Sequence, residues 1–320
     1  MYDPVLAALE SLVVGEPQTA GGLQVFGVRY AVIPEPLPYL LLDEALQKGL
    51  LRIEEINESG QVPKLRAVNE ADVAVFVLVG DQLIGAKQNR VVNTSILLKP
   101  KSAEIIPVSC VEQGRWAYRS HTFYSKGTAG HYSLRRAMQN YVTERLMMRG
   151  QFESDQASVW QEVRRKLEQL KSFSASEALE QAYEDYQYTL DELIKKHPVP
   201  EDSVGAVFAF NGEVAGLEVF DNAETLRKLW PKLLRSYGLD ALTARCHQEI
   251  STTEVVDWIQ NHGDLEFHAY KPPGMGEDIR FSNEYMTGSA LVADGRVIHL
   301  SIFPQRKFKR EMEVEEALVF

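Results

Sequence analysis

The chain has 320 residues, of which 45% are hydrophobic and 25% are charged. This composition is typical of a globular protein and excludes a largely disordered or fibrous chain. The length predicts about two packing units, or one large domain that carries an insertion. The 34 basic and 45 acidic residues give a net charge of −11. That charge repels nucleic-acid phosphates and anionic lipids, so generic nucleic-acid binding is disfavoured.

The sequence carries no pattern of export or membrane insertion. The first four residues lack a basic leader, and Glu10 interrupts the early apolar stretch, so we expect no signal or transit peptide. The best apolar run, residues 73–79, is far shorter than the roughly 18 residues that a membrane helix needs. The only two cysteines, Cys110 and Cys246, fit a reducing compartment better than a disulfide bridge. We therefore expect a cytoplasmic protein.

Residues 1–131 are predicted to be rich in β-strands. Short apolar or alternating runs are separated there by glycine, proline and asparagine, as in antiparallel sheets. These runs are residues 23–33, 51–56, 65–69, 73–79 and 104–111. A short helix is expected at residues 41–48.

Residues 132–197 are predicted to form a helical insertion. Leu134, Met138, Val142 and Leu146 recur at helical spacing. A second helix is expected to start at Asp155, which is a good N-cap, and a third follows a capping-box pattern at residues 174–177. The acidic face of the third helix is expected to be solvated, with a docking surface as the alternative; its residues are Glu180, Glu184, Asp185 and Asp191.

Residues 198–320 are predicted to return to β-structure with two helices. The pairs at residues 211–212 and 294–295 are Asn-Gly and Asp-Gly, which favour type I′ hairpins. A helix at residues 223–236 should be kinked or broken at Pro231, and a shorter one should run from Thr252 or Thr253 toward Gln260. The basic residues 306–310 are followed at once by glutamates, which makes them a weak nucleic-acid site.

The fold class expected from this pattern is α+β, with antiparallel β-sheet layers from the N- and C-terminal parts and a helical insertion between them. The three parts are predicted to form one composite domain. Sustained strand–helix alternation with a glycine-rich phosphate loop is missing, so a dinucleotide-binding fold is not indicated. Residues 74–85 and 206–216 share a weak similarity, which indicates a common hairpin or a duplicated β unit.

A first polar cluster occupies residues 85–93, between apolar runs. If the stretch is extended, Gln88 and Arg90 share one face while Asn89 and Asn93 share the other. A turn or bulge near Gly85 would aim them at one ligand. The alternative is that the amides satisfy buried backbone groups.

A second polar cluster occupies residues 107–116. Cys110 and Glu112 project from one side of an extended strand, and a turn at Gly114 would fold Arg115 and Trp116 back over them. A guanidinium, a carboxylate and an indole suit a nucleotide or sugar phosphate through phosphate binding, ribose binding or proton transfer, and stacking. Alternatively, the arginine pairs with the glutamate, the tryptophan is a core residue and the cysteine is a small buried side chain.

Further candidate residues lie outside these two clusters. Gln156 and Trp160 lie one turn apart on the second helix, where they either close over the strand cluster or serve as packing residues. The seven histidines show no compact ligand spacing, so no metal site is predicted. His299 is expected to be a hydrogen-bonded core residue. The turn-rich residues 271–278 are a surface loop, or a lid over a site.

Three stretches carry a family resemblance: residues 80–90, residues 107–116, and Asp155-Gln156 with Val159-Trp160. They resemble the ARG and Rhodanese-Phosphatase-superfamily-associated protein domain, an uncharacterised bacterial family. The likeness spans most of the chain and is strongest at residues 39–160. The name of the family implies a place in NAD or ADP-ribose metabolism, and it implies ADP-ribose-processing enzymes as partners. It supplies no activity, cofactor or agreed catalytic residue.

Two main hypotheses follow. In the first, the chain binds and processes ADP-ribose or a related nucleotide or ribose phosphate, as a hydrolase or isomerase. Glu112 would be the acid/base group and Trp116 would stack on the base. The remaining roles are phosphate binding by Arg90 and Arg115, and sugar or base binding by Gln88, Asn89 and Asn93. In the second, the same residues form a noncatalytic module that senses nucleotides or positions a partner enzyme. A purely structural role for them is a third possibility.

Overall fold

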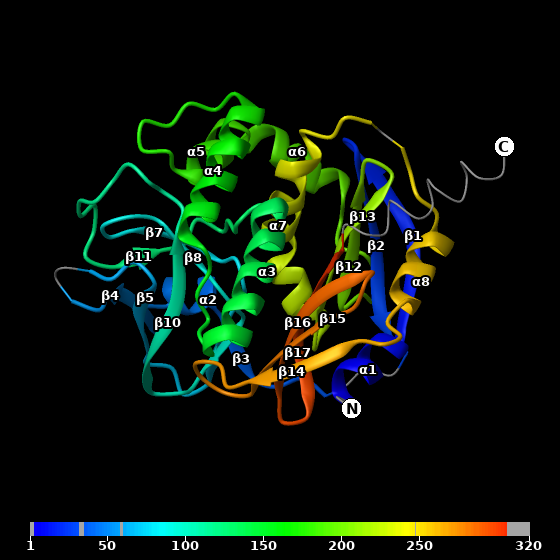
Figure 1. Cartoon of the computed structure of the whole chain (residues 1–320), viewed down its shortest axis with the longest axis horizontal. Coiled ribbons are helices and arrows are strands. Elements are labelled where there is room, and N and C mark those ends of the chain that lie inside the picture. The colour runs from blue at the N-terminus through cyan, green and yellow to red at the C-terminus, as the bar shows by residue number, and fades with distance from the viewer. Residues whose placement is uncertain (1–2, 32–34, 58–59, 247, 306–320) are drawn as a thin grey trace.

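The computed structural model describes residues 3–31, 35–57, 60–246 and 248–305. Its eight helices and seventeen strands, with antiparallel sheets and helices in the middle of the chain, confirm the α+β prediction. The two β-rich parts lie on opposite sides of the molecule, and helices lie between them (Figure 1). The basic residues 306–310 lie outside the described residues.

The larger β-rich part is an eight-stranded antiparallel sheet built from both ends of the chain. β2 pairs with β12, so the two N-terminal strands extend a sheet whose other strands are C-terminal. In sheet order the strands are β1 (Leu12–Ala20), β2 (Leu23–Tyr30), β12 (Gly205–Phe210), β13 (Glu213–Phe220), β17 (Arg296–Pro304), β16 (Met286–Ala293), β15 (Glu277–Ser282) and β14 (Glu266–Tyr270).

The smaller β-rich part consists of two sheets that enclose a common apolar core. The first has the order β11 (Phe123–Tyr124), β7 (Gln82–Gly85), β8 (Arg90–Val92), β10 (Ser102–Cys110), β5 (Lys64–Asn69) and β4 (Leu51–Glu55). The second has the order β3 (Tyr39–Leu41), β6 (Ala74–Val77) and β9 (Ile96–Leu98), and β3 pairs with β6 in parallel. The expected strands of residues 51–111 are therefore present.

The helices cover the sheets and join them. They are α1 (Asp3–Glu10), α2 (Leu42–Gln47), α3 (Tyr132–Arg149), α4 (Gln156–Leu170), α5 (Leu179–Asp185), α6 (Gln187–Lys196), α7 (Ala223–Ala241) and α8 (Thr252–Gln260). α7 packs its leucines against one face of the large sheet and against β6, while α1 and α8 cover the other face. No helix in the described part of the chain is long and apolar enough to cross a membrane.

Turn and cap chemistry explains several predicted boundaries. Asn211 and Gly212 have φ values of 59° and 73°, and Asp294 and Gly295 have 50° and 71°, as their two hairpins require. The Asp155 side chain accepts a hydrogen bond from the Ser158 N–H and caps α4. These short-range predictions are confirmed.

The helical insertion differs from the prediction in two respects. It contains four helices, because Tyr186 separates α5 from α6, and no capping box forms at residues 174–177. Glu177 has a φ of 51°, so it lies in a turn before α5 rather than in its first turn. The expectation of a wholly solvated acidic face is wrong for Glu180, which is buried and accepts a hydrogen bond from Thr128 at 3.1 Å.

Neither alternative for the similarity of residues 74–85 and 206–216, a common hairpin or a duplicated β unit, is present. Residues 206–208 lie in β12, which forms a hairpin with β13, whereas residues 74–76 lie in β6. β6 belongs to the three-stranded sheet and the next strand, β7, to the six-stranded one.

α7 runs on without a break past Pro231, because its apolar face is buried along both sides of that residue. Neither α1 nor β1 was predicted.

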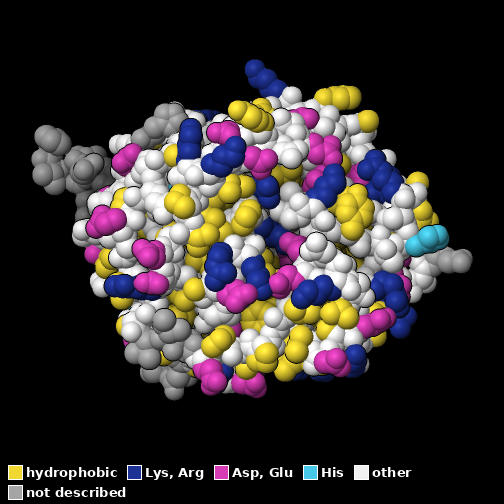
Figure 2. Space-filling model, turned by 180° about the vertical axis from the view of Figure 1, so that it is seen from behind, with side chains coloured by type: hydrophobic (Ala, Val, Ile, Leu, Met, Phe, Trp, Pro, Cys, Tyr) yellow, Lys and Arg dark blue, Asp and Glu magenta, His cyan; other side chains and the backbone are white. Residues whose placement is uncertain are grey.

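The surface seen from behind carries basic and acidic side chains interspersed with apolar ones (Figure 2). On this face, among the described residues, no single large basic area is visible.

Candidate functional site

The first polar cluster is a buried turn between β7 and β8. Gly85 has a φ of 118° and Ala86 one of 36°, so the strand bends sharply there. A Cβ on Gly85 would lie 2.4 Å from Ser120 Oγ, which leaves room only for glycine. Gln88, Asn89 and Arg90 are 5%, 2% and 0% exposed. The turn near Gly85 was expected, and it brings the first polar cluster against the second.

Glu112 is the centre of a hydrogen-bonded cluster. It is fully buried, and Arg115 donates to it from Nε at 3.0 Å and from Nη2 at 2.7 Å. Ser176 donates its hydroxyl at 2.7 Å and Asn89 its backbone N–H at 3.1 Å. Four donors therefore occupy the two carboxylate oxygens. Burial alone would raise the pKa of Glu112, but these donors outweigh it and lower the pKa.

Arg115 is equally committed to the protein. Besides Glu112, its guanidinium donates to the backbone carbonyls of Ala86 at 2.6 Å, Ala117 at 2.8 Å and Gly85 at 3.2 Å. Its Nη2 also donates to Asn89 Oδ1 at 3.2 Å. All three guanidinium nitrogens are bonded, and the pair joins the two polar clusters. We name residues 85–90 and 112–117 the polar loop pair.

A second group of side chains lies on the buried side of the polar loop pair and includes its own Gln88 and Arg90. Arg90 Nη1 donates to Gln88 Oε1 at 3.1 Å, and the Cys110 thiol donates to the same oxygen at 2.9 Å. Glu55, from β4, lies 3.6 Å from Arg90 Nη2. Burial raises the pKa of the Cys110 thiol to about 11, although Arg90 opposes the shift. The thiol therefore stays protonated near neutral pH and is a poor nucleophile.

The outer surface of the polar loop pair is aromatic and cationic. Trp116 and Tyr118 are 48% and 47% exposed. Lys87 Nζ lies 5.3 Å from the ring centre of the tryptophan and 5.0 Å from that of the tyrosine. Arg90 lies 5.7 Å from the same indole, at the protein side. These distances are those of cation–π contacts. Because Trp116 is half-exposed, it is not a core residue, and that alternative is wrong.

Asn93 and Gln156 lie beside this cluster, where they tie α4 and the segment before it to the strands. Gln156 accepts from the Cys110 N–H at 2.8 Å and donates to the Cys110 carbonyl at 2.9 Å, as a neighbouring strand would. Asn93 donates to the Phe152 carbonyl at 2.9 Å. The Trp160 Nε1 group is buried and has no hydrogen-bond partner among the described residues. Asn93 and Gln156 thus bond neighbouring backbone.

The structure therefore joins the predicted residues, apart from Trp160, into one region. Sequence reasoning missed Glu55, Tyr118 and Ser176, which come from β4, the loop before β11 and the turn before α5. Lys87 stood inside the first polar cluster, and its place between apolar runs was the one signal that could have identified it. Nothing in the local sequence marks Glu55, because its exposed neighbours in β4 are charged as well.

A separate buried cluster has the contacts of a Ser-His-acid triad. Ser95 Oγ lies 2.9 Å from His299 Nδ1, and His299 Nε2 lies 2.9 Å from Glu218 Oε2. The three residues are 6%, 1% and 0% exposed, and the serine oxygen also accepts the Val79 N–H. Burial keeps substrates away from the serine, so the contacts tie the loop after β8 to β17 and β13. The core role expected for His299 is confirmed.

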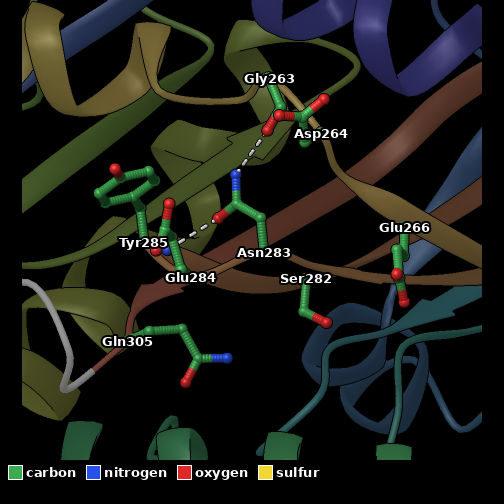
Figure 3. A pocket seen from close by; sticks show the side chains of 8 residues that line it. All are labelled: Gly263, Asp264, Glu266, Ser282, Asn283, Glu284, Tyr285 and Gln305. Atoms are coloured by element: carbon green, nitrogen blue, oxygen red, sulfur yellow. Dashed lines mark hydrogen bonds between the residues drawn. The ribbon is translucent and has the colours of Figure 1, made fainter.

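A surface cavity of about 590 Å³ lies elsewhere, at the start of β14 and the turn between β15 and β16 (Figure 3). Asn283 lies at its centre and donates to the Gly263 carbonyl at 2.9 Å. Three of the lining residues are acidic: Asp264, Glu266 and Glu284. This cavity contains none of the predicted site residues, and its charge disfavours a phosphate ligand.

In the described ranges, no group of three His, Cys, Asp or Glu side chains is arranged to hold a metal ion.

One comparison with known proteins is informative. The model of the ARG and Rhodanese-Phosphatase-superfamily-associated Protein domain matches residues 11–303. The chain belongs to this family. The match spans both polar clusters, every helix except α1, and the strands of all three sheets up to Phe303. The family's domain therefore covers nearly the whole α+β unit, and the resemblance read from three stretches is confirmed. No curated protein and no solved structure matches the chain.

Proposed function

We propose that the chain binds ADP-ribose or a related nucleotide or ribose phosphate without converting it. It would then act as a sensing or positioning module in NAD metabolism. The observation that carries the proposal is the pair of half-exposed rings, Trp116 and Tyr118, which both lie within cation–π distance of Lys87.

An aromatic and cationic surface suits both ends of a nucleotide. Stacking of a base on an aromatic side chain contributes about 1–3 kcal/mol. The Lys87 ammonium near both rings adds positive charge to the site, although only 9% of the residue is exposed. The Arg119 side chain, which is 62% exposed and lies 3.8 Å from Glu112, offers a charge for phosphate. The net charge of the protein is negative, so a local cationic site of this kind is needed to attract an anion.

The noncatalytic form of the proposal follows from Glu112. A general acid must carry a proton near the working pH, and a general base needs a free lone pair. Four donors occupy the carboxylate of Glu112 and lower its pKa, so neither condition is met. The Glu112–Arg115 pair would instead hold the loop that presents the rings.

The family supplies the proposed partners. Its description names an association with ARG proteins and rhodanese-phosphatases. We propose ADP-ribose-processing enzymes as the partners of this chain. Both cysteines are free thiols, Cys110 buried and Cys246 exposed, which supports the proposed cytoplasmic location.

Calorimetry with ADP-ribose and with NAD tests the binding step. We expect Trp116→Ala to weaken ADP-ribose binding by roughly 5- to 150-fold, which corresponds to the loss of about 1–3 kcal/mol of stacking. Tyr188→Ala is the matched control, because Tyr188 is 80% exposed on α6, outside the site. Equal affinity of the Trp116 variant and the wild type would refute the site.

A search for products in the same mixtures tests the noncatalytic step. Chromatography after long incubation should recover ADP-ribose and NAD unchanged. If a product forms, the enzyme hypothesis holds, and Glu112→Gln should then abolish turnover while sparing ligand affinity. Turnover that survives Glu112→Gln would remove Glu112 from the mechanism.

A further inference from the structure

Arg90 and Glu55 form a buried ion pair whose hydrogen bonding is incomplete. Their side chains are 0% and 3% exposed, and the closest nitrogen–oxygen distance is 3.6 Å. That distance is too long for a good hydrogen bond. Nε and Nη2 of the arginine and both carboxylate oxygens of the glutamate lack a hydrogen-bond partner of good geometry within the described ranges, although the Lys87 backbone N–H is near enough to Glu55 to lower its pKa. A buried polar group without a hydrogen-bond partner destabilises the folded protein. The unpaired atoms of Arg90 and Glu55 are therefore best explained by a ligand group that would complete their hydrogen bonds.

The pair lies directly beneath Trp116. The Arg90 guanidinium carbon is 5.7 Å from the centre of the indole. A Cβ built on Gly60 would lie 3.3 Å from Glu55 Oε2 and 3.3 Å from Trp116 Cζ2, so the carboxylate reaches the same indole. A movement of the half-exposed indole would open the pair to a ligand that stacks on the ring.

The chemistry of the pair favours an uncharged hydroxyl. Free donors on Arg90 and free acceptors on Glu55 are complemented by a group that both accepts and donates a hydrogen bond. The two charges cancel, so a phosphate would gain from the arginine and be repelled by the carboxylate. A hydroxyl meets no such repulsion, and two neighbouring hydroxyls would satisfy more of the free atoms.

We infer, building on the proposed function, that Arg90 and Glu55 are the subsite for the ribose hydroxyls of the bound nucleotide. A hydroxyl would donate to the Glu55 carboxylate and accept from Arg90 Nε or Nη2. The sequence had suggested that Arg90 binds phosphate, whereas this inference assigns Arg90 to the sugar. Phosphate is then left to the exposed Arg119. Burial raises the pKa of Glu55 although Arg90 lowers it, and a hydroxyl donor would stabilise the charged carboxylate.

Binding of AMP, 2′-deoxy-AMP and 3′-deoxy-AMP to the wild-type protein tests the inference. We expect at least one deoxy analogue to bind 10-fold or more weakly than AMP, because charged groups are left unpaired when the hydroxyl is missing. The double variant Glu55→Leu/Arg90→Leu removes both charges together, which avoids leaving one buried and alone. It should bind all three nucleotides within about 2-fold of one another, since a pair of leucines offers no hydrogen bond.

The outcomes separate this inference from the proposed function. If AMP and both deoxy analogues bind the wild type within 2-fold, the subsite is overturned and the pair is served by water, while nucleotide binding stands. If AMP, ADP-ribose and NAD all fail to bind, the proposed function falls and the subsite with it. If the double variant keeps the wild-type preference for AMP, the hydroxyls are read elsewhere and the assignment is wrong.

Discussion

Removal of the Arg115 guanidinium is the sharpest test of how the polar loop pair is held. Arg115→Met leaves the Glu112 carboxylate buried beside its two remaining donors and frees three backbone carbonyls. Removal of one partner from a buried ion pair costs about 3–5 kcal/mol. We therefore expect the free energy of unfolding to fall by about 3–5 kcal/mol. With a urea m-value of about 3 kcal/mol per M, the unfolding midpoint would fall by about 1 to 1.7 M.

Urea unfolding followed by tryptophan fluorescence measures this change. Arg164→Met is the control for a surface ion pair, because its side chain is 48% exposed and pairs with Glu177 at 3.2 Å. Its other hydrogen bond, to the Gln113 side chain, is exposed as well. Such an exposed ion pair contributes about 0–1 kcal/mol. A double change, Glu112→Gln/Arg115→Met, should be more stable than Arg115→Met alone, since it leaves no buried charge. An Arg115→Met protein as stable as the Arg164→Met control would refute the structural role of the pair.

Three further outcomes are expected. Because the folded pKa of Glu112 is lowered from 4.5, its contribution is present above that pH and lost as the pH falls through the folded pKa. The stability deficit of Glu112→Gln should therefore shrink in urea titrations taken from about pH 7 to about pH 3; a deficit that is constant with pH would contradict the shift. A disulfide reagent at about pH 8 should label Cys246 at once and Cys110, whose pKa is about 11, only after unfolding; equal rates would show that Cys110 is accessible. Gly274→Ala should lower the thermal midpoint more than Gly295→Ala, because a Cβ at Gly274 would lie 2.3 Å from a β9 carbonyl oxygen, whereas at Gly295 nothing lies within 4 Å; similar midpoints would show that the loop is not seated on β9.

The sequence predicted best what short-range chemistry determines. The two glycine-containing hairpins, the Asp155 cap and the turn at Gly85 each depend on a few neighbouring residues, and each is present. Prediction failed where distant parts of the chain meet. Glu180 looked solvated along its helix, yet Thr128 from another segment covers it.

The candidate site shows the same division. Glu112 and Arg115 could be paired from their spacing of three residues, and they do pair. The partners that complete the cluster, such as Ser176, are far away in the chain. The exposure of Trp116 likewise depends on how the loop leaves the strand, which periodicity does not describe.

The pairing of β2 with β12 places a constraint on biosynthesis. β2 ends at Tyr30 and β12 begins at Gly205, so the first strands leave the ribosome long before their central neighbour exists. Until then β2 carries an open apolar edge of the kind that recruits chaperones or aggregates. Nascent chains arrested near residue 200 should thus be far more sensitive to protease than chains released after residue 305, since the large sheet closes only when β17 is complete.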